Sequence, residues 1–259
     1  MLDTLQYILG LLSGGLVGFT LGLVGGGGSI LAVPLMVYLV GVQSPHVAIG
    51  TSALAVAINA ATGLVNHARH GTVKWRCGLM YAGAGVLGAF AGSSAGKAFD
   101  GQRLLFLFAI VMIVVGVLML RRRRHQGHES AQCHRENAAK VLGAGLGTGG
   151  FSGFFGIGGG FLIVPGLIAS TGMPMINAVG TSLVAVTAFG LTTAANYAFS
   201  GLVDWTLAGV FIAGGVLGSF VGTRAAKRLS GSGQLTTVFA VLIFVVAAYM
   251  LWQSALAAF

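Results

Sequence analysis

Gly18–Pro34 reads GFTLGLVGGGGSILAVP, and Gly149–Pro165 reads GGFSGFFGIGGGFLIVP. When the second stretch is shifted back by 131 positions, the two prolines coincide. Runs of glycine interrupt helices, yet both stretches lie in otherwise apolar sequence. In a bilayer an interrupted helix exposes backbone polar groups, which is tolerated only where protein or a water-filled cavity surrounds them. Paired interruptions in the two halves of a chain indicate the binding site of a transporter.

The composition is typical of an integral membrane protein. Hydrophobic residues make up 56% of the chain and charged residues only 7%, whereas soluble domains carry about 25% charged residues. The net charge of +9 does not indicate nucleic-acid binding, because the basic residues lie in short runs between apolar segments, as in the cytoplasmic loops of membrane proteins. We therefore expect a lipid bilayer around the chain and no nucleic-acid partner.

The cysteines and histidines do not form a recognisable site. Cys77 and Cys133 give no disulfide framework, and we expect no bond between them. The long polar stretch at residues 121–140 carries His125, His128, Cys133 and His134 without a standard zinc spacing. We expect this stretch to be a solvated cytoplasmic connector, with no metal and no cofactor in the protein.

The repeat extends through both halves of the chain. At an offset of 130, Gly50-Thr51-Ser52 corresponds to Gly180-Thr181-Ser182, and Trp75 corresponds to Trp205. In the same register, the VLGAF sequence at 86–90 corresponds to VLGSF at 216–220. One offset across so many landmarks indicates a duplication. We expect a first membrane repeat at 1–121, a cytoplasmic linker at 122–137 and a second membrane repeat at 138–259.

Each repeat contains five apolar segments. They span roughly 5–24, 28–41, 46–66, 77–96 and 104–120 in the first half, and 138–156, 158–172, 176–198, 206–223 and 235–253 in the second. A full span needs about 20 apolar residues. The second segment of each half is shorter, so it is either a short crossing or one arm of a re-entrant element.

The distribution of basic residues distinguishes between two topologies. Five crossings in each half make the halves inverted and place twelve Lys and Arg residues in the cytoplasm and two, Lys97 and Arg103, outside. Four crossings make the halves parallel and give nine against five. Cytoplasmic loops of membrane proteins are enriched in Lys and Arg. The sequence therefore favours inverted repeats, each of four to five transmembrane segments with a glycine-broken helix pair.

The sequence contains no arrangement of residues that is typical of an enzyme active site. All five carboxylates fall in or beside expected loops, at Asp3, Asp100, Glu129, Glu136 and Asp204, and we expect no histidine near the middle of a span. Ser52 and Ser182 have no neighbouring base on the same segment that would make them nucleophiles. We expect no catalysis and no evident proton relay within the membrane.

The glycine runs instead suggest an anion site without fixed charge. New apolar segments begin at Ser29 and Phe161, and the start of a helix presents unpaired N–H groups that bind small oxyanions. Nearby hydroxyl and amide groups would add hydrogen-bond donors. The candidate substrate-binding residues are Gly25, Gly26, Gly27, Gly28, Ser29, Thr51, Ser52, Asn59, Gly156, Gly158, Gly159, Gly160, Thr181, Ser182 and Asn196.

Each of these features also has a purely structural interpretation. Glycines at four-residue spacing, as at Gly14, Gly18 and Gly22, allow membrane helices to approach closely, and we expect them to serve packing. The Thr and Ser hydroxyls of the two Gly-Thr-Ser sequences could instead bond to carbonyls of their own helix. For Asn66 and Asn196 we favour a role in joining helices.

The duplicated pattern G-x-x-G-G-G-x-[SG]-x-x-x-x-P, at Gly22–Pro34 and Gly153–Pro165, resembles that of the TauE/SafE sulfite exporter family. The Gly-Thr-Ser and V-L-G-[AS]-F sequences fit the same family, and the resemblance covers about residues 5 to 253. It implies an inner-membrane permease of bacterial type for small sulfur-containing anions such as sulfite, sulfoacetate or related organosulfonates. The two halves differ, because Gly26 corresponds to Ile157 and Ser29 to Gly160.

We therefore expect an all-α membrane transporter that moves a small sulfur-containing anion by alternating access at a midplane site. The alternatives are a passive anion channel, a permease for another small oxyanion or carboxylate, and a membrane receptor or assembly factor. The short loops disfavour the last of these. The sequence leaves the direction of transport, the coupling ion and assembly into a homo-oligomer open.

Overall fold

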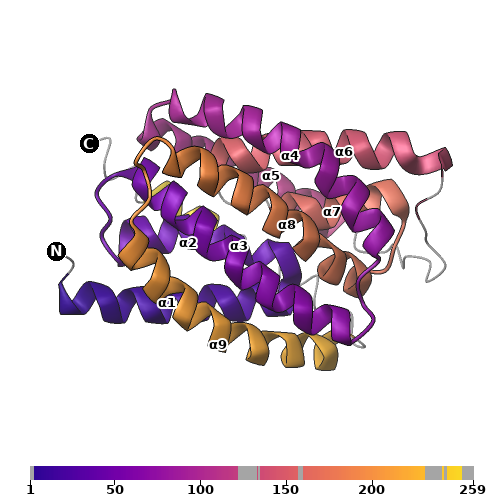
Figure 1. Cartoon of the computed structure of the whole chain (residues 1–259), viewed down its shortest axis with the longest axis horizontal. Coiled ribbons are helices and arrows are strands. Elements are labelled where there is room, and N and C mark those ends of the chain that lie inside the picture. The colour runs from indigo at the N-terminus through magenta and orange to yellow at the C-terminus, as the bar shows by residue number, and fades with distance from the viewer. Residues whose placement is uncertain are drawn as a thin grey trace.

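The chain forms a bundle of helices (Figure 1), and the computed structural model describes residues 3–121, 133, 135–156, 160–230, 241 and 244–252. The first half contains α1 (Thr4–Val24), the 3₁₀ helix η1 (Gly25–Leu31), α2 (Ala32–Pro34), the π-helix η2 (Leu35–Leu39), α3 (Pro45–Arg69), α4 (Trp75–Lys97) and α5 (Gly101–Arg121). The second half contains α6 (Arg135–Phe155), α7 (Gly160–Thr171), α8 (Met175–Ala198) and α9 (Trp205–Ser230), and residues 244–252 are helical. Every regular element in the described ranges is helical, which confirms the all-α prediction.

Several helices have the length and apolar composition of membrane spans. Within the described residues these are Thr4–Leu39, Pro45–Arg69, Met175–Ala198 and Trp205–Ala225. Trp75 and Trp205 begin α4 and α9 and are half or more exposed, as expected of aromatic side chains at a membrane interface. The linker at 122–137 lies largely outside the described residues, as do its three histidines.

The helices pack in three pairs that join the two halves. In Figure 1, α4 and α6 lie along one side, α1 and α9 lie along the other, and α3 and α8 cross between them. Each outer pair combines the first long helix of one half with the helix that begins at Trp75 or Trp205 in the other. The central pair combines the two helices that carry the Gly-Thr-Ser sequences.

The directions of these helices follow from their close contacts. A Cβ atom on Gly14 would overlap the backbone of Phe211, and one on Gly22 would overlap that of Ser219, so α1 and α9 run parallel. Gly145 and Gly153 of α6 meet Tyr81 and Ala89 of α4 in the same way, so that pair is also parallel.

The central pair runs in opposite directions. Gly63 of α3 lies against Leu183 of α8, and Gly190 of α8 lies against Ala57 and Ala53 of α3. Residue numbers thus rise along one helix as they fall along the other. The helices α3 and α8 are therefore antiparallel.

The four-residue glycine spacing serves helix packing, as predicted. Gly14, Gly18 and Gly22 rest on the α9 backbone, while Gly88, Gly92 and Gly96 rest on the α6 backbone. Because any side chain there would collide with main-chain atoms, only glycine permits these approaches.

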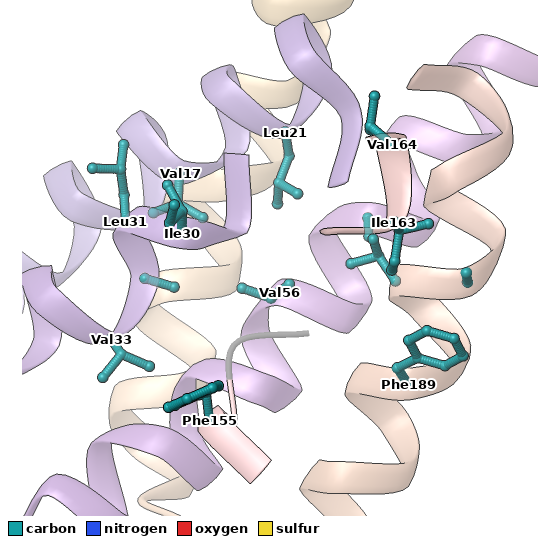
Figure 2. Packing of buried hydrophobic residues seen from close by; sticks show 14 of the residues in the cluster. Val17, Leu21, Ile30, Leu31, Val33, Val56, Phe155, Ile163, Val164 and Phe189 are labelled. Atoms are coloured by element: carbon teal, nitrogen blue, oxygen red, sulfur yellow. The ribbon is translucent and has the colours of Figure 1, made fainter. Parts of the chain in front are cut away.

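Apolar side chains from both halves fill the middle of the bundle. Figure 2 shows Leu21 and Ile30 from the first half with Ile163 and Phe189 from the second, and Val56 of α3 between them. These five side chains are fully buried. The core is therefore shared by the two halves.

The segment after α1 returns along the whole length of that helix. Gln6 Nε2, in the first turn of α1, donates to the carbonyl of Val40 at 3.2 Å. A 3₁₀ helix rises about 2.0 Å per residue against about 1.5 Å in an α-helix. The 3₁₀ geometry of Gly25–Leu31 thus lets a short segment cover the length of α1, so it is a complete return rather than a half-length arm.

Left-handed glycines occur in matching pairs. Gly25 and Gly156 have φ of 67° and 68°, Gly41 and Gly172 have 82° and 70°, and Gly71 and Gly201 have 69° and 70°. The first two pairs are 131 positions apart and the third 130. Because glycine alone adopts positive φ without strain, these turns keep the same backbone shape in both halves.

The prediction that Cys77 and Cys133 remain unbonded is wrong. Their Cα atoms lie 5.4 Å apart, and the two side chains form a disulfide across 56 positions of sequence. Cys77 lies in the first turn of α4 and Cys133 shortly before α6. The packing of α4 against α6 brings together these two residues, whose spacing in the sequence contains no signal of a pair.

Candidate functional site

The first glycine break, residues 25–31, is a sharp reversal of the chain. Gly25 takes the left-handed turn that ends α1, and all seven residues of η1 are buried. Gly28 lies directly on the backbone of Thr20 and Leu21, so a side chain at this position would collide with α1. Ser29 Oγ donates to the carbonyl of Gly26 at 2.8 Å. Glycine is therefore required both for the turn and for the close return.

The predicted start of an α-helix at Ser29 is wrong. The 3₁₀ helix already begins at Gly25, and the α-helix follows only at Ala32. Four consecutive glycines remove the side-chain restraints, so the backbone can tighten into a 3₁₀ helix. The N–H of Gly26 donates to Ser182 Oγ at 3.0 Å, so Gly26 faces the second half of the chain.

The second glycine break begins at Gly156, 131 positions after Gly25. Gly156 makes the left-handed turn after α6, and α7 begins at Gly160. The candidates Gly158 and Gly159 lie outside the described residues. The helix α7 packs against η1, so the first glycine break lies beside the helix that follows the second.

Each glycine break lies against the central helix of the other half. A Cβ atom on Gly25 would lie 2.5 Å from the carbonyl oxygen of Val179 and 2.9 Å from Ser182 Oγ. Gly156 meets Ile49 in the same way. Ile49 and Val179 occupy equivalent positions just before the two Gly-Thr-Ser sequences. The breaks and these sequences therefore form one buried region built from both halves.

Threonines 51 and 181 hold the helix starts of the opposite half. Thr51 Oγ1 accepts from the N–H of Asp204, and Thr181 Oγ1 accepts from the N–H of Lys74, both at 2.9 Å. Asp204 and Lys74 directly precede α9 and α4. The serines fit the structural alternative, because Ser52 donates to the carbonyl of Ile49 and Ser182 to that of Val179. The starts of α4 and α9 thus depend on the hydroxyls of Thr181 and Thr51, which the sequence suggested as substrate-binding groups.

Asn59 differs from the other predicted polar residues in its hydrogen bonding. It is fully buried in α3, and both Oδ1 and Nδ2 are without a hydrogen-bond partner among the described residues. Its amide lies against Gly215 of α9, where the equivalent contact in the other half is Phe189 against Gly85. An unpaired buried amide costs about 1–3 kcal/mol. A ligand that bonded to this amide would remove that cost.

Asn196 joins helices, as favoured from the sequence. Its Nδ2 donates to Ser93 Oγ at 2.6 Å, and its Oδ1 accepts from Lys97 Nζ at 2.8 Å. Lys97 also donates to Ser200 Oγ. These bonds fasten the end of α4 to the end of α8 and leave Asn196 away from the first glycine break.

The sequence interpretation missed His67. This residue follows the apolar segment 46–66 expected from the sequence, but it lies in the last turn of α3 and is 1% exposed. Its Nε2 contacts the carbonyl of Gly22 at 3.2 Å, just before the first glycine break. The helix α3 continues to Arg69, three residues beyond the apolar segment that marked it in the sequence.

Comparisons with known proteins identify the family of the chain. The family described as "Sulfite exporter TauE/SafE" matches residues 10–250, nearly the whole chain. The chain belongs to the TauE/SafE family. As a TauE/SafE protein it is a multi-pass membrane transporter and not an enzyme.

Curated relatives of this TauE/SafE chain carry matching descriptions. A "probable membrane transporter protein" of Xylella fastidiosa is 54% identical over 93% of this chain and 94% of its own length. The "probable membrane transporter protein YunE" of Bacillus subtilis is 26% identical over 89% of this chain and 93% of its own length. No solved structure matches the chain.

Proposed function

We propose that this TauE/SafE transporter moves small sulfur-containing anions, such as sulfite, sulfoacetate or related organosulfonates, by alternating access between the two glycine breaks. The proposal rests on one observation above all: η1 packs on α7, and each break lies against the central helix of the other half. A substrate held there would contact both halves, so a rearrangement between them could change the side to which it is open.

We further propose that 1–121 and 138–259 are inverted repeats around the linker 122–137. Equivalent helices α3 and α8 run antiparallel, while α1 is parallel to α9 and α4 to α6. A twofold axis perpendicular to α3 and α8 accounts for all three relations. The paired left-handed glycines support the same symmetry. Transporters built from inverted repeats place their substrate at the repeat interface near the membrane midplane.

The chemistry of the region suits an anion. The residues of η1, α7 and the middle of α3 and α8 include no carboxylate. The Asn59 amide, which has no partner among the described residues, and the backbone N–H groups at the start of α7 can donate to oxyanion oxygens. Such a site would hold sulfonate or sulfite oxygens without a fixed charge that prevents release.

Flux measurements in proteoliposomes test this function. Radiolabelled sulfoacetate or sulfite should exchange across the membrane with saturation and counterflow, and unlabelled sulfonates should compete better than carboxylates or phosphate. A passive channel would instead conduct without saturation or counterflow. Competition by a carboxylate alone would assign the site to another class of anion.

A further inference from the structure

His67 is a buried histidine with both ring nitrogens engaged beside the first glycine break. Nε2 lies 3.2 Å from the carbonyl oxygen of Gly22, and Nδ1 lies 2.9 Å from Thr72 Oγ1. Thr72 lies in the loop between α3 and α4 and is half-buried. The imidazole therefore bridges the last turn of α1 and a loop that reaches solvent.

The first glycine break makes the contact between His67 and the end of α1 possible. In a continuous α-helix the carbonyl of Gly22 would accept from the N–H of Gly26. That N–H donates to Ser182 Oγ instead. The carbonyl of Gly22 is thus available at the carboxyl end of α1, where the helix dipole favours positive charge. Because a carbonyl only accepts, Nε2 of His67 carries a proton.

The contact with Thr72 satisfies two protonation states. Thr72 Oγ1 lies 3.0 Å from the carbonyl of His67 and can donate to it, in which case Nδ1–H donates to Thr72 and the imidazole is positively charged. When the imidazole is neutral, the Thr72 hydroxyl turns and donates to Nδ1. In both states the two nitrogens are paired. His67 can therefore bind or release a proton without leaving a buried polar group unsatisfied.

The equivalent turn in the other half has the same backbone hydrogen bond but different side chains. The N–H of Thr72 bonds to the carbonyl of His67 at 3.2 Å, and the N–H of Leu202 bonds to that of Tyr197 at 3.0 Å. Tyr197 and Leu202 stand 130 positions after His67 and Thr72. The backbone of the turn needs neither imidazole nor hydroxyl, so its geometry does not explain their presence.

The charged groups around His67 are basic. Arg69 and His70 lie on its own turn and the next, Lys74 and Arg76 lie in the loop and at the start of α4, and Arg224 lies on α9. Lys227 and Arg228 follow on α9, with side chains outside the described ones. Along α1, η1 and the first three turns of α8, Tyr7 at the far end of α1 alone carries a titratable side chain. Within the described residues these elements carry no carboxylate, and a bound anion would attract a charged His67.

We propose that His67 binds the proton that is transported together with the anion. This inference rests on the proposed function and assigns its coupling ion. An anion at the first break and the proton on His67 attract one another, so each raises the affinity for the other. On release, the proton passes from Nδ1 to Thr72 Oγ1 while the Thr72 hydroxyl proton passes to water at the loop. Anion and proton therefore leave together.

Purified full-length protein in proteoliposomes tests this coupling with labelled sulfoacetate, whose carboxyl and sulfonate groups stay ionised between pH 6 and 8 as acids of low pKa. The membrane potential is held at zero with valinomycin and equal potassium. Exchange at equal pH reports transport, and accumulation against an imposed pH difference reports coupling. One proton per anion and a difference of about one pH unit predict about tenfold accumulation.

His67→Tyr, which installs the residue of the other half, should lose this accumulation while exchange remains measurable. Tyr197→Phe is the matched control and should accumulate like the wild type. Should His67→Tyr fail to reach the membrane, Thr72→Val should lose accumulation and Thr72→Ser retain it.

Three results would overturn the inference. The first is wild-type exchange without accumulation, which leaves the proposed function intact. The second is full accumulation by His67→Tyr or Thr72→Val. The third is a wild type that exchanges no sulfur-containing anion, which overturns the proposed function as well.

Discussion

At the scale of single residues, the polar side chains of the site divide into satisfied and unsatisfied ones. Thr51, Thr181 and Asn196 all bond to protein groups that they position. Asn59 alone among the candidate side chains of the described chain has no partner at either amide atom. The stability of the fold and the binding of substrate should therefore depend on different residues.

Substitution of Asn59 should separate these two roles. Asn59→Leu removes an unpaired amide from an apolar surrounding and keeps the branching and the number of heavy atoms of the side chain, so we expect the free energy of unfolding to rise, by about 1–3 kcal/mol. Transport should nevertheless fall, because the ligand loses its amide partner. Thermal unfolding in detergent and proteoliposome exchange measure the two effects.

Asn196→Leu is the matched comparison and should have the opposite effect on stability. It leaves Lys97 Nζ with one fewer acceptor and breaks the bond to Ser93, so we expect a loss of about 1–3 kcal/mol. A lower melting temperature for Asn59→Leu than for Asn196→Leu would contradict this division of roles.

At the scale of elements, the sequence predicted the helices well and their contacts less well. The apolar segments, their breaks and the packing glycines were readable because hydrophobicity and glycine act locally. The Cys77–Cys133 bond and the partners of Thr51 depend on which helices become neighbours, and no local pattern specifies that. His67 was missed because the end of α3 extends past its apolar stretch, where the sequence resembles a loop.

The contact of α1 with α9 should be the most sensitive to added volume. In Gly18→Leu the new side chain meets the backbone of Gly215, and backbone cannot move aside as a side chain can. We expect destabilisation of about 3 kcal/mol or more, visible as a lower melting temperature in detergent. Gly83→Leu is the control, because Gly83 of α4 has open space where a Cβ would lie. Equal melting temperatures would contradict the close approach.

At the scale of the whole molecule, the proposed inverted repeats explain several features together. The helix directions, the paired left-handed glycines and the asymmetry of loop charge all follow from one duplication in opposite orientations. The side chains are less symmetric than the backbone. His67 contacts the carbonyl of Gly22 and the hydroxyl of Thr72, whereas Tyr197 and Leu202 occupy the equivalent places.

Accessibility of the two equivalent turns tests the orientation. In a protein whose native cysteines are replaced by serine, Gly71→Cys should react only with reagents that enter the cytoplasm. Ser200→Cys should react with impermeant reagents from outside. Labelling of both positions from one side would indicate parallel repeats.

The central claim is that the glycine breaks form the anion site, and one measurement tests it most directly. Sulfoacetate exchange is measured in proteoliposomes for the wild type, Gly27→Leu in the buried first break and Gly83→Leu on the open face of α4, each purified as folded protein. The account predicts exchange by the wild type and Gly83→Leu, and a loss of at least about a hundredfold for Gly27→Leu, as when binding groups are displaced by about 1 Å. Exchange by folded Gly27→Leu at the wild-type rate would contradict it.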